Sequence, residues 1–226
     1  ILTDVECTTS SLSFVKDVLF PYSRAKLPEF VRQHQQEPNI KQLLADTCRE
    51  AGITCICDTD PNAAIVQLIA WIDQDKKITP LKALQGLIWQ TGYEKGDLKG
   101  HLYPDAIVNL KSWKNKGISL YVYSSGSVLA QKLLFGHTEV GDLTTLFSGF
   151  FDTNIGGKKE AESYRKIADE IGLSADNILF LSDIKEELDA AEEADFQTIC
   201  LVRDQELNAD TGHLQVSNFD EIELDG

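Results

Sequence analysis

Hydrophobic positions follow helical spacing throughout the first part of the chain. Prolines at 61 and 80 precede two of the apolar segments and a glycine at 52 follows another, which is typical of helix starts and ends. The spacing predicts helices over 12–34, 39–51, 63–72 and 81–89, with a strand only at 54–57. Residues 10–95 therefore form a predicted helical block.

Beyond Gly100, short apolar runs alternate with helical segments. The runs predict strands over 118–123, 149–152, 178–183 and 198–202, and the segments predict helices over 105–114, 128–135, 163–171 and 186–194. Nearly continuous apolar strands alternating with helices indicate a parallel sheet covered on both faces. A first strand over 1–4 belongs with this α/β part, although the helical block follows it directly. We therefore predict an α/β core from 1–9 and 100–226, with a helical cap of 10–99 inserted after the first strand.

The charge balance narrows the classes of partner. The 226 residues include 36 acidic and 21 basic side chains, and the formal net charge is -15. Nucleic acid and anionic membrane surfaces both need a basic footprint, so we expect neither as a partner. No apolar run reaches the roughly 18 residues of a membrane span, and no basic-then-apolar leader opens the chain. An anionic substrate must therefore meet locally placed donors or a metal ion.

The cysteines do not form a recognisable framework. They are odd in number, they contain no CxxC, and they stand at Cys7, Cys48, Cys55, Cys57 and Cys200. We expect reduced thiols in a cytoplasmic protein. The chain has no methionine, so we expect its natural N-terminus a few residues upstream.

Chemically capable side chains stand at one edge of the predicted sheet. The candidates, in chain order, are Asp4, Glu6, Ser124, Ser125, Lys158 and Asp183. Ligands bind outside the carboxyl ends of strands in open parallel sheets. Each candidate also has a structural interpretation, because Asp183 and the serines can cap helices and Lys158 can be a solvated surface residue. Their shared position at one edge of the sheet favours a functional role over these structural interpretations.

The set suits phosphoryl transfer. A carboxylate such as Asp4 can accept a phosphoryl group that water then removes, and Glu6 can serve as general acid and base. Asp4 and Asp183 offer oxygen ligands for Mg²⁺, which would offset the repulsion between carboxylate and phosphate. The Ser124 hydroxyl and amides at a helix N-terminus can hold phosphate oxygens, and Lys158 adds positive charge.

These residues resemble the haloacid-dehalogenase superfamily of phosphohydrolases and, more narrowly, the enolase-phosphatase family of methionine salvage. The resemblance covers nearly the whole chain and includes DVECTTSSLSFVKDVLFPYSR, LYVYSSGSVLAQKLLFG and ILFLSDIKEELDAAEEA. It implies a Rossmann-like core with a helical cap and one Mg²⁺ per chain. The implied reaction enolises 2,3-diketo-5-methylthiopentyl-1-phosphate and dephosphorylates it to the acireductone 1,2-dihydroxy-3-keto-5-methylthiopentene. We expect a monomer that acts on this small phosphorylated diketone.

The resemblance also implies roles at the two carboxylate positions. Asp4 would be the nucleophile and a metal ligand. Glu6 would be the general acid and base, with its backbone carbonyl on the metal. Asp183 would be the remaining protein ligand, supported from behind by Glu187, one helical turn further on.

Phosphate binding is implied for three other positions. Ser124 and Ser125 match the residues that hold the substrate phosphate. Lys158 matches the phosphate-neutralising lysine better than Lys159 does, because it directly follows the turn formed by Ile155 and its two glycines.

One position departs from the family pattern, since Cys7 stands where the family usually has glycine. A Cβ and a thiol there would crowd the site, and we expect weakened turnover. Three alternatives remain open: a sugar-phosphate phosphatase of the same superfamily, an inactive variant that only binds, and a cysteine-dependent enzyme centred on Cys7. The last needs a histidine base, and none of the four histidines pairs with Cys7 in a motif. Candidates for the enolisation base are Glu6 and a cap residue near 82–89, and Phe20 and Trp89 are candidates for an apolar pocket.

Overall fold

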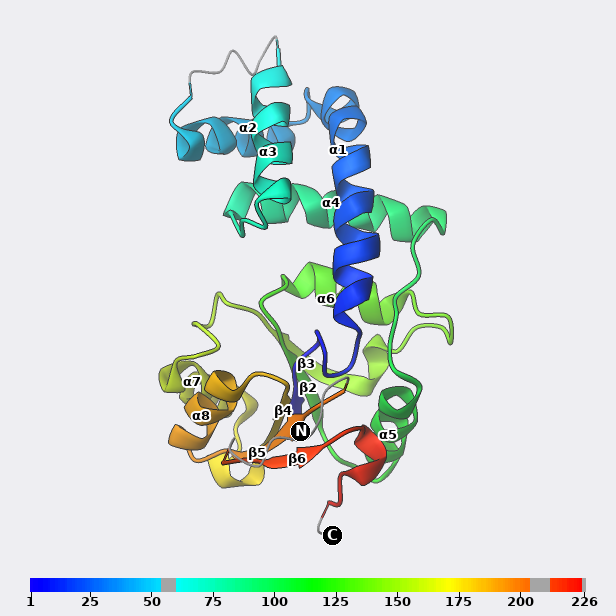
Figure 1. The fold of residues 1–226 in the computed structure, drawn as a ribbon, viewed down its shortest axis with the longest axis vertical. Coiled ribbons are helices and arrows are strands. Elements are labelled where there is room, and N and C mark those ends of the chain that lie inside the picture. Colours follow the sequence, from blue (N-terminus) through cyan, green and yellow to red (C-terminus); the bar gives the residue numbers. More distant parts are fainter. Residues whose placement is uncertain (54–59, 204–211, 225–226) are drawn as a thin grey trace. The chain divides into compact units, whose positions relative to one another are not determined.

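The computed structural model describes residues 1–53, 60–203 and 212–224 (Figure 1). The chain divides into two compact units, which we call the core unit (Ile1–Leu12 with Lys99–Gly226) and the helical unit (Ser13–Leu98). The expected boundaries after residues 9 and 99 lie three residues and one residue from these bounds. The expected strand at 54–57 lies outside the described residues.

The core unit is built on a six-stranded parallel sheet with the order β3-β2-β1-β4-β5-β6. The two-residue strand β1 is central, with Thr3 opposite Val122 of β2 and Leu181 of β4. The parallel α/β sheet predicted from the sequence is confirmed, and the short strand β6 adds an element that the pattern did not predict. The strands are β1 (Leu2–Thr3), β2 (Leu120–Tyr123), β3 (Phe147–Phe151), β4 (Leu179–Ser182), β5 (Gln197–Leu201) and β6 (Leu214–Val216).

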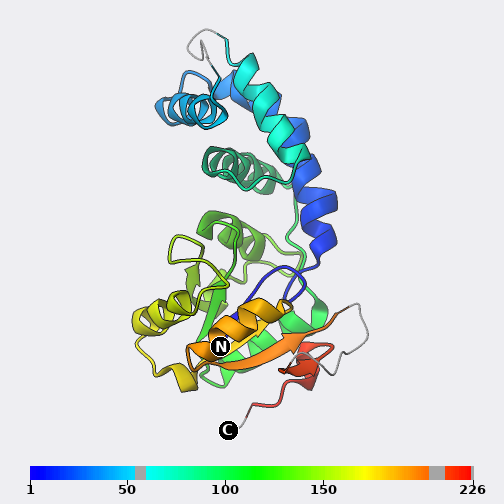
Figure 2. The same ribbon diagram turned by 60° about the vertical axis from the view of Figure 1, so that its left-hand side comes forward.

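Helices cover both faces of this sheet (Figures 1 and 2). Helices α7 (Ala161–Ile171) and α8 (Lys185–Glu193) lie on one face, and α5 (Pro104–Asn115) lies on the other. Helix α6 (Val128–Gly136) follows β2. On the first face, the buried ring of Tyr164 packs edge-on against Tyr123 and Phe180, at centroid distances of 5.6 and 5.2 Å. This aromatic packing fixes β2 and β4 beside β1, and so fixes the strand ends that carry the candidate residues.

Two short segments complete the core unit. The 3₁₀ turn η2 (Thr144–Leu146) leads into β3, and η3 (Ala175–Asn177) leads towards β4. Near the C-terminus, η4 (Phe219–Glu221) places Phe219 against Trp113 of α5, with ring centroids 5.4 Å apart. The C-terminal segment is thereby anchored to α5.

The helical unit has its own apolar core. It contains the π-helical segment η1 (Phe14–Leu19) and helices α1 (Phe20–His34), α2 (Pro38–Ala51), α3 (Asn62–Asp73) and α4 (Thr79–Lys95). The helix predicted over 12–34 is therefore two elements, a π-helical segment and an α-helix. Trp89 stacks on Phe20 at a centroid distance of 6.4 Å, and its indole N–H donates to the carbonyl of Leu19 at 2.9 Å. The core side chains include Leu27, Val31, Ile40, Leu44, Leu68 and Leu84, all fully buried.

The thiols differ from the expectation in one case. Cys7 and Cys200 are free, but Cys48 is disulfide-bonded, so the expectation of reduced thiols is wrong for Cys48. An odd number of cysteines without a CxxC motif still permits one disulfide. The cysteine count and spacing therefore could not establish that every thiol is reduced. In the described parts of the chain, no helix combines the length and apolar character needed to cross a bilayer.

Candidate active site

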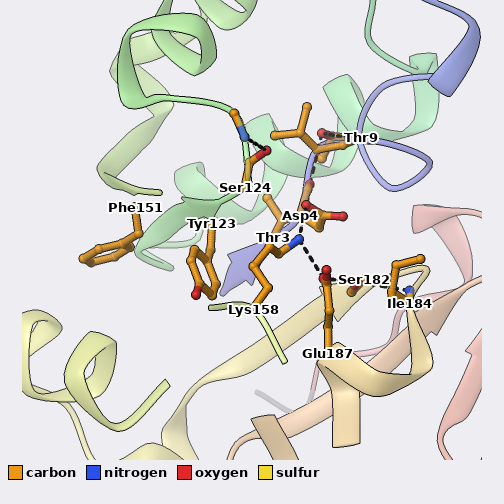
Figure 3. A network of polar contacts seen from close by, with 12 residues as sticks. Thr3, Asp4, Thr9, Tyr123, Ser124, Phe151, Lys158, Ser182, Ile184 and Glu187 are labelled. Atoms are coloured by element: carbon orange, nitrogen blue, oxygen red, sulfur yellow. Dashed lines mark hydrogen bonds and ion pairs between the residues drawn. The ribbon is translucent and has the colours of Figure 1, made fainter. Parts of the chain in front are cut away.

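Asp4 lies directly after β1, at the centre of the carboxyl edge of the sheet (Figure 3). Its backbone N–H donates to the Leu181 carbonyl at 2.8 Å, which extends the pairing with β4 by one residue. The hydroxyls of Thr3 and Thr9 both donate to the Asp4 carbonyl oxygen, at 3.0 and 3.2 Å. The backbone of this residue is therefore held from several sides, and only 5% of Asp4 is exposed.

The loop after Asp4 turns back on itself. The N–H groups of Thr8, Thr9 and Ser10 all donate to the Val5 carbonyl, at 3.3, 3.0 and 2.8 Å. Glu6 lies in this turn and is partly exposed. Its backbone forms an isolated parallel β-bridge with Ser10. The tight reversal keeps Glu6 close to the carboxyl end of β1, which is where the sequence analysis expects it.

Cys7 occupies the most strained position of the turn. Its φ of 56° lies in the left-handed region, which favours glycine. Burial, followed by the negative charge of Asp183, raises the pKa of Cys7 to about 11. Because the thiolate is the reactive form, a thiol that stays protonated is a poor nucleophile. The geometry therefore disfavours the cysteine-dependent alternative.

Lys158 lies between two carboxylates. Its Nζ is 2.6 Å from Asp4 Oδ1 and 2.6 Å from Glu187 Oε2, and 9% of the residue is exposed (Figure 3). Burial lowers the pKa of Lys158, but the charges of Asp4 and Glu187 outweigh burial and raise it overall. Lys159, in contrast, is exposed and lies 3.8 Å from the exposed carboxylate of Glu186. The structure thus brings Lys158, and not Lys159, to the carboxyl edge as a fixed cation.

Glu187 lies beside Lys158 at this edge of the sheet, and its expected support of a metal ligand stays a prediction. Its carboxylate contacts Lys158 directly and also accepts a hydrogen bond from the Ser182 hydroxyl at 3.0 Å. Burial and the charge of Asp4 raise the pKa of Glu187, and Lys158 opposes them. This residue therefore orients the lysine.

The turn before Lys158 is held by two buried tyrosines that the sequence analysis did not identify. The Tyr123 hydroxyl donates to the Gly156 carbonyl at 3.0 Å, and the Tyr164 hydroxyl donates to the Lys158 carbonyl at 2.6 Å. Gly156 has a φ of 151°, and a Cβ there would collide with the Ser163 hydroxyl. The paired glycines before Lys158 were the available sequence signal for this requirement.

Ser124 and Ser125 lie between β2 and the N-terminus of α6. The Ser124 N–H donates to the Phe151 carbonyl at 3.2 Å, and its hydroxyl accepts from the Gly126 N–H at 3.1 Å. The actual helix cap is Ser127, whose hydroxyl accepts from the Ala130 N–H at 3.2 Å. Ser124 is buried and Ser125 is half-buried. Backbone amides and hydroxyls thus gather at a helix start, an arrangement that favours anions.

Asp183 follows β4 and is electrostatically coupled to Asp4. Burial, followed by the negative charge of Asp4, raises the pKa of Asp183 to about 7. A divalent cation would relieve this repulsion, and Mg²⁺ typically takes one or two carboxylates with waters and substrate oxygens. The oxygen donors of Asp4 and Asp183 therefore fit Mg²⁺. No cluster of three or more His, Cys, Asp or Glu side chains suited to a metal occurs within the described ranges.

Comparison with known proteins agrees with this geometry. A family model described as haloacid dehalogenase-like hydrolase matches residues 28–195. Enolase-phosphatase E1 of Thioalkalivibrio sulfidiphilus is 59% identical over 203 residues, covering 90% of this chain and 89% of the relative. Enolase-phosphatase E1 of Methylococcus capsulatus is 55% identical over 222 residues, covering 98% and 96%.

A solved structure shares the fold over nearly the whole chain. The UTR4 protein of Saccharomyces cerevisiae matches with a TM-score of 0.80 and 34% identity, covering 98% of each chain. The family resemblance drawn from the sequence is therefore confirmed. The chain belongs to the enolase-phosphatase E1 family of haloacid dehalogenase-like hydrolases.

Proposed function

We propose that this enzyme is a Mg²⁺-dependent acireductone synthase of methionine salvage. It converts 2,3-diketo-5-methylthiopentyl-1-phosphate into 1,2-dihydroxy-3-keto-5-methylthiopentene and phosphate by enolisation followed by dephosphorylation. The names of the relatives support the activity class. The observation that carries the proposal is the contact of 2.6 Å between Lys158 Nζ and Asp4 Oδ1 at the carboxyl edge of the sheet. That contact pairs a nucleophilic carboxylate with a fixed positive charge.

In the first half of dephosphorylation, an Asp4 carboxylate oxygen attacks phosphorus and the bond to the substrate oxygen breaks. Glu6 donates a proton to the departing oxygen, which leaves an aspartyl-phosphate on Asp4. In the second half, the Glu6 carboxylate takes a proton from water. The water oxygen attacks phosphorus, and free phosphate and the Asp4 carboxylate are restored.

Phosphoryl transfer depends chiefly on positioning and on charge neutralisation. Ser124, Ser125 and the amides at the start of α6 hold phosphate oxygens, and Lys158 offsets their negative charge. Asp4, Asp183 and the Glu6 carbonyl would hold Mg²⁺. When bound, this ion supplies the positive charge that lets the phosphate dianion approach the Asp4 carboxylate.

The test uses the diketo phosphate with Mg²⁺ and follows two signals. Enolisation appears as ultraviolet absorbance of the enol, and dephosphorylation appears as released phosphate. We expect Asp4→Asn to abolish phosphate release, whereas full release by that variant contradicts the aspartyl-phosphate mechanism. Hydrolysis of sugar phosphates without enolisation of the diketone would support the alternative phosphatase instead.

The same assay identifies the enolisation base. If Glu6 is the base, Glu6→Gln stops both the absorbance change and phosphate release. If the variant still enolises but no longer dephosphorylates, the base is another residue.

We also propose that the enzyme acts in the cytoplasm as a monomer. A charged phosphate ester does not cross the hydrocarbon core of a bilayer readily, which supports action in the compartment where the substrate is made. Cell fractionation tests the location, and the mass measured by light scattering tests the oligomeric state.

A further inference from the structure

Arg203, two residues after the end of β5, contacts the turn that follows Asp4. Its side chain is 6% exposed. Its Nε and Nη2 both donate to the Thr8 carbonyl oxygen, at 3.2 and 2.7 Å. We infer that Arg203 is a positioning residue that holds the turn of residues 4–10 in its productive geometry through this carbonyl. The inference rests on the proposed function, in which Asp4 and Glu6 of that turn perform the chemistry.

The guanidinium group is itself fixed on its other sides. Its Nη1 lies 2.6 Å from Asp105 Oδ2, and that oxygen also accepts the Phe219 N–H at 2.8 Å. The rings of Tyr103 and Phe219 lie 4.2 and 5.2 Å from the guanidinium carbon. Stacking and a carboxylate partner suit the planar fork of arginine, which a lysine ammonium does not reproduce. The guanidinium group therefore links the turn to α5 and to the C-terminal segment and fixes the turn relative to both.

The turn of residues 4–10 contains a strained residue, so contacts from outside the turn help to hold its conformation. Cys7, next to Thr8, adopts a left-handed backbone with φ of 56°, which an L side chain disfavours. Bonds from a charged guanidinium to the Thr8 carbonyl are charge-assisted and stronger than neutral ones. Displacement of Thr8 would pass to Asp4, because the next residue, Thr9, donates its hydroxyl to the Asp4 carbonyl at 3.2 Å. The chain of contacts thus runs from Arg203 to the proposed nucleophile without Arg203 touching substrate.

The experiment compares Arg203→Met, which removes the fork, with Arg203→Lys, which keeps the charge. For the diketo phosphate with Mg²⁺, we expect kcat to fall on the order of 100-fold in Arg203→Met, as for a catalytic group displaced by about 1 Å. KM should change less than about threefold, because Ser124 and Lys158 are untouched. Arg203→Lys should recover less than about a tenth of the lost rate, since lysine lacks the two-pronged geometry.

A matched control separates positioning from general destabilisation. Ile222→Ala removes a buried side chain of the same C-terminal segment and should lower the melting temperature without the selective loss of kcat. If Arg203→Met loses no more rate than Ile222→Ala at equal folded fraction, the inference is wrong. Full activity in Arg203→Lys overturns it as well.

Hydrogen exchange gives a readout that does not depend on the substrate. In Arg203→Met we expect the amides of residues 8–10 to lose protection, while amides of β2 keep theirs. If Arg203→Met folds poorly, Asp105→Asn replaces it, because this change loosens the guanidinium and leaves the arginine present. Unchanged exchange in residues 8–10 contradicts the inference. An inactive wild-type enzyme with the expected exchange pattern contradicts only the proposed function.

Discussion

Replacing Cys7 with glycine tests how one residue affects the metal site. The Cys7 thiol lies near Asp183, a proposed ligand of Mg²⁺, and the charge of that carboxylate raises the pKa of the thiol. Mg²⁺ that binds the Asp183 carboxylate must therefore compete with the thiol for it. The variant removes both this competitor and the Cβ from a backbone with φ of 56°. We therefore expect Mg²⁺ to bind more tightly and turnover to rise.

The size of the effect follows if the interaction between thiol and carboxylate has the strength of an ordinary hydrogen bond. A net contribution of about 1 kcal/mol for such a bond corresponds to about a fivefold lower Mg²⁺ concentration at half-maximal rate. Stability should change little. Relief of the left-handed backbone gains about 1 kcal/mol, and the greater chain entropy of glycine offsets about 0.5–1 kcal/mol of this.

The assay is phosphate release from the diketo phosphate over a Mg²⁺ titration, combined with urea denaturation. Cys7→Ala separates the two causes, because it removes the thiol but keeps the Cβ and its backbone strain. Cys7→Ser keeps a donor beside Asp183 and should not gain Mg²⁺ affinity. If glycine and alanine both leave the Mg²⁺ dependence unchanged, the thiol does not compete with the cation and this reasoning is refuted.

Three further predictions follow from the buried lysine, the glycine turn and the thiol. Lys158→Met leaves two buried carboxylates without a counter-charge and should lower the free energy of unfolding by about 3–5 kcal/mol. Adding Glu187→Gln should recover part of that loss in urea denaturation. Gly156→Ala should reduce the melting temperature more than Gly172→Ala, because both have positive φ but only the first would place a Cβ against another residue. Alkylation of Cys7 by iodoacetamide should rise about tenfold per pH unit from pH 7 to 10, since its pKa is about 11, and a plateau near pH 8.5 would contradict this.

Local sequence patterns predicted the fold well where they were long enough to read. Continuous apolar runs gave the strands around Val122 and Leu181, and these flank β1 as a parallel sheet requires. Strand β6 was missed because it has only three residues, and Leu214 at its start is 65% exposed. A segment so short and so exposed does not produce a strand pattern. The same limit applies to η1, since helical spacing does not distinguish π from α geometry over six residues.

The sequence predicts those residues of the candidate site that lie at strand ends or in local motifs. Asp4 and Asp183 lie together because parallel strands end at one edge of a sheet. The contacts of Lys158 with Glu187, and of Arg203 with Thr8, join elements that have no local pattern in common. Such contacts arise from the packing of the whole core unit, so no spacing in the sequence predicts them.

The position of β1 in the sheet determines when the active site can form during protein synthesis. The helical unit is a continuous stretch, so all of its residues are available once Leu98 has been made. β1, by contrast, precedes both of its partners, β2 at Leu120–Tyr123 and β4 at Leu179–Ser182. Its pairing is therefore non-local and must await most of the chain. Strand β1 leaves the ribosome before both of its partners and is completed only after the second of them emerges, so Asp4 reaches its final surroundings long after it is made.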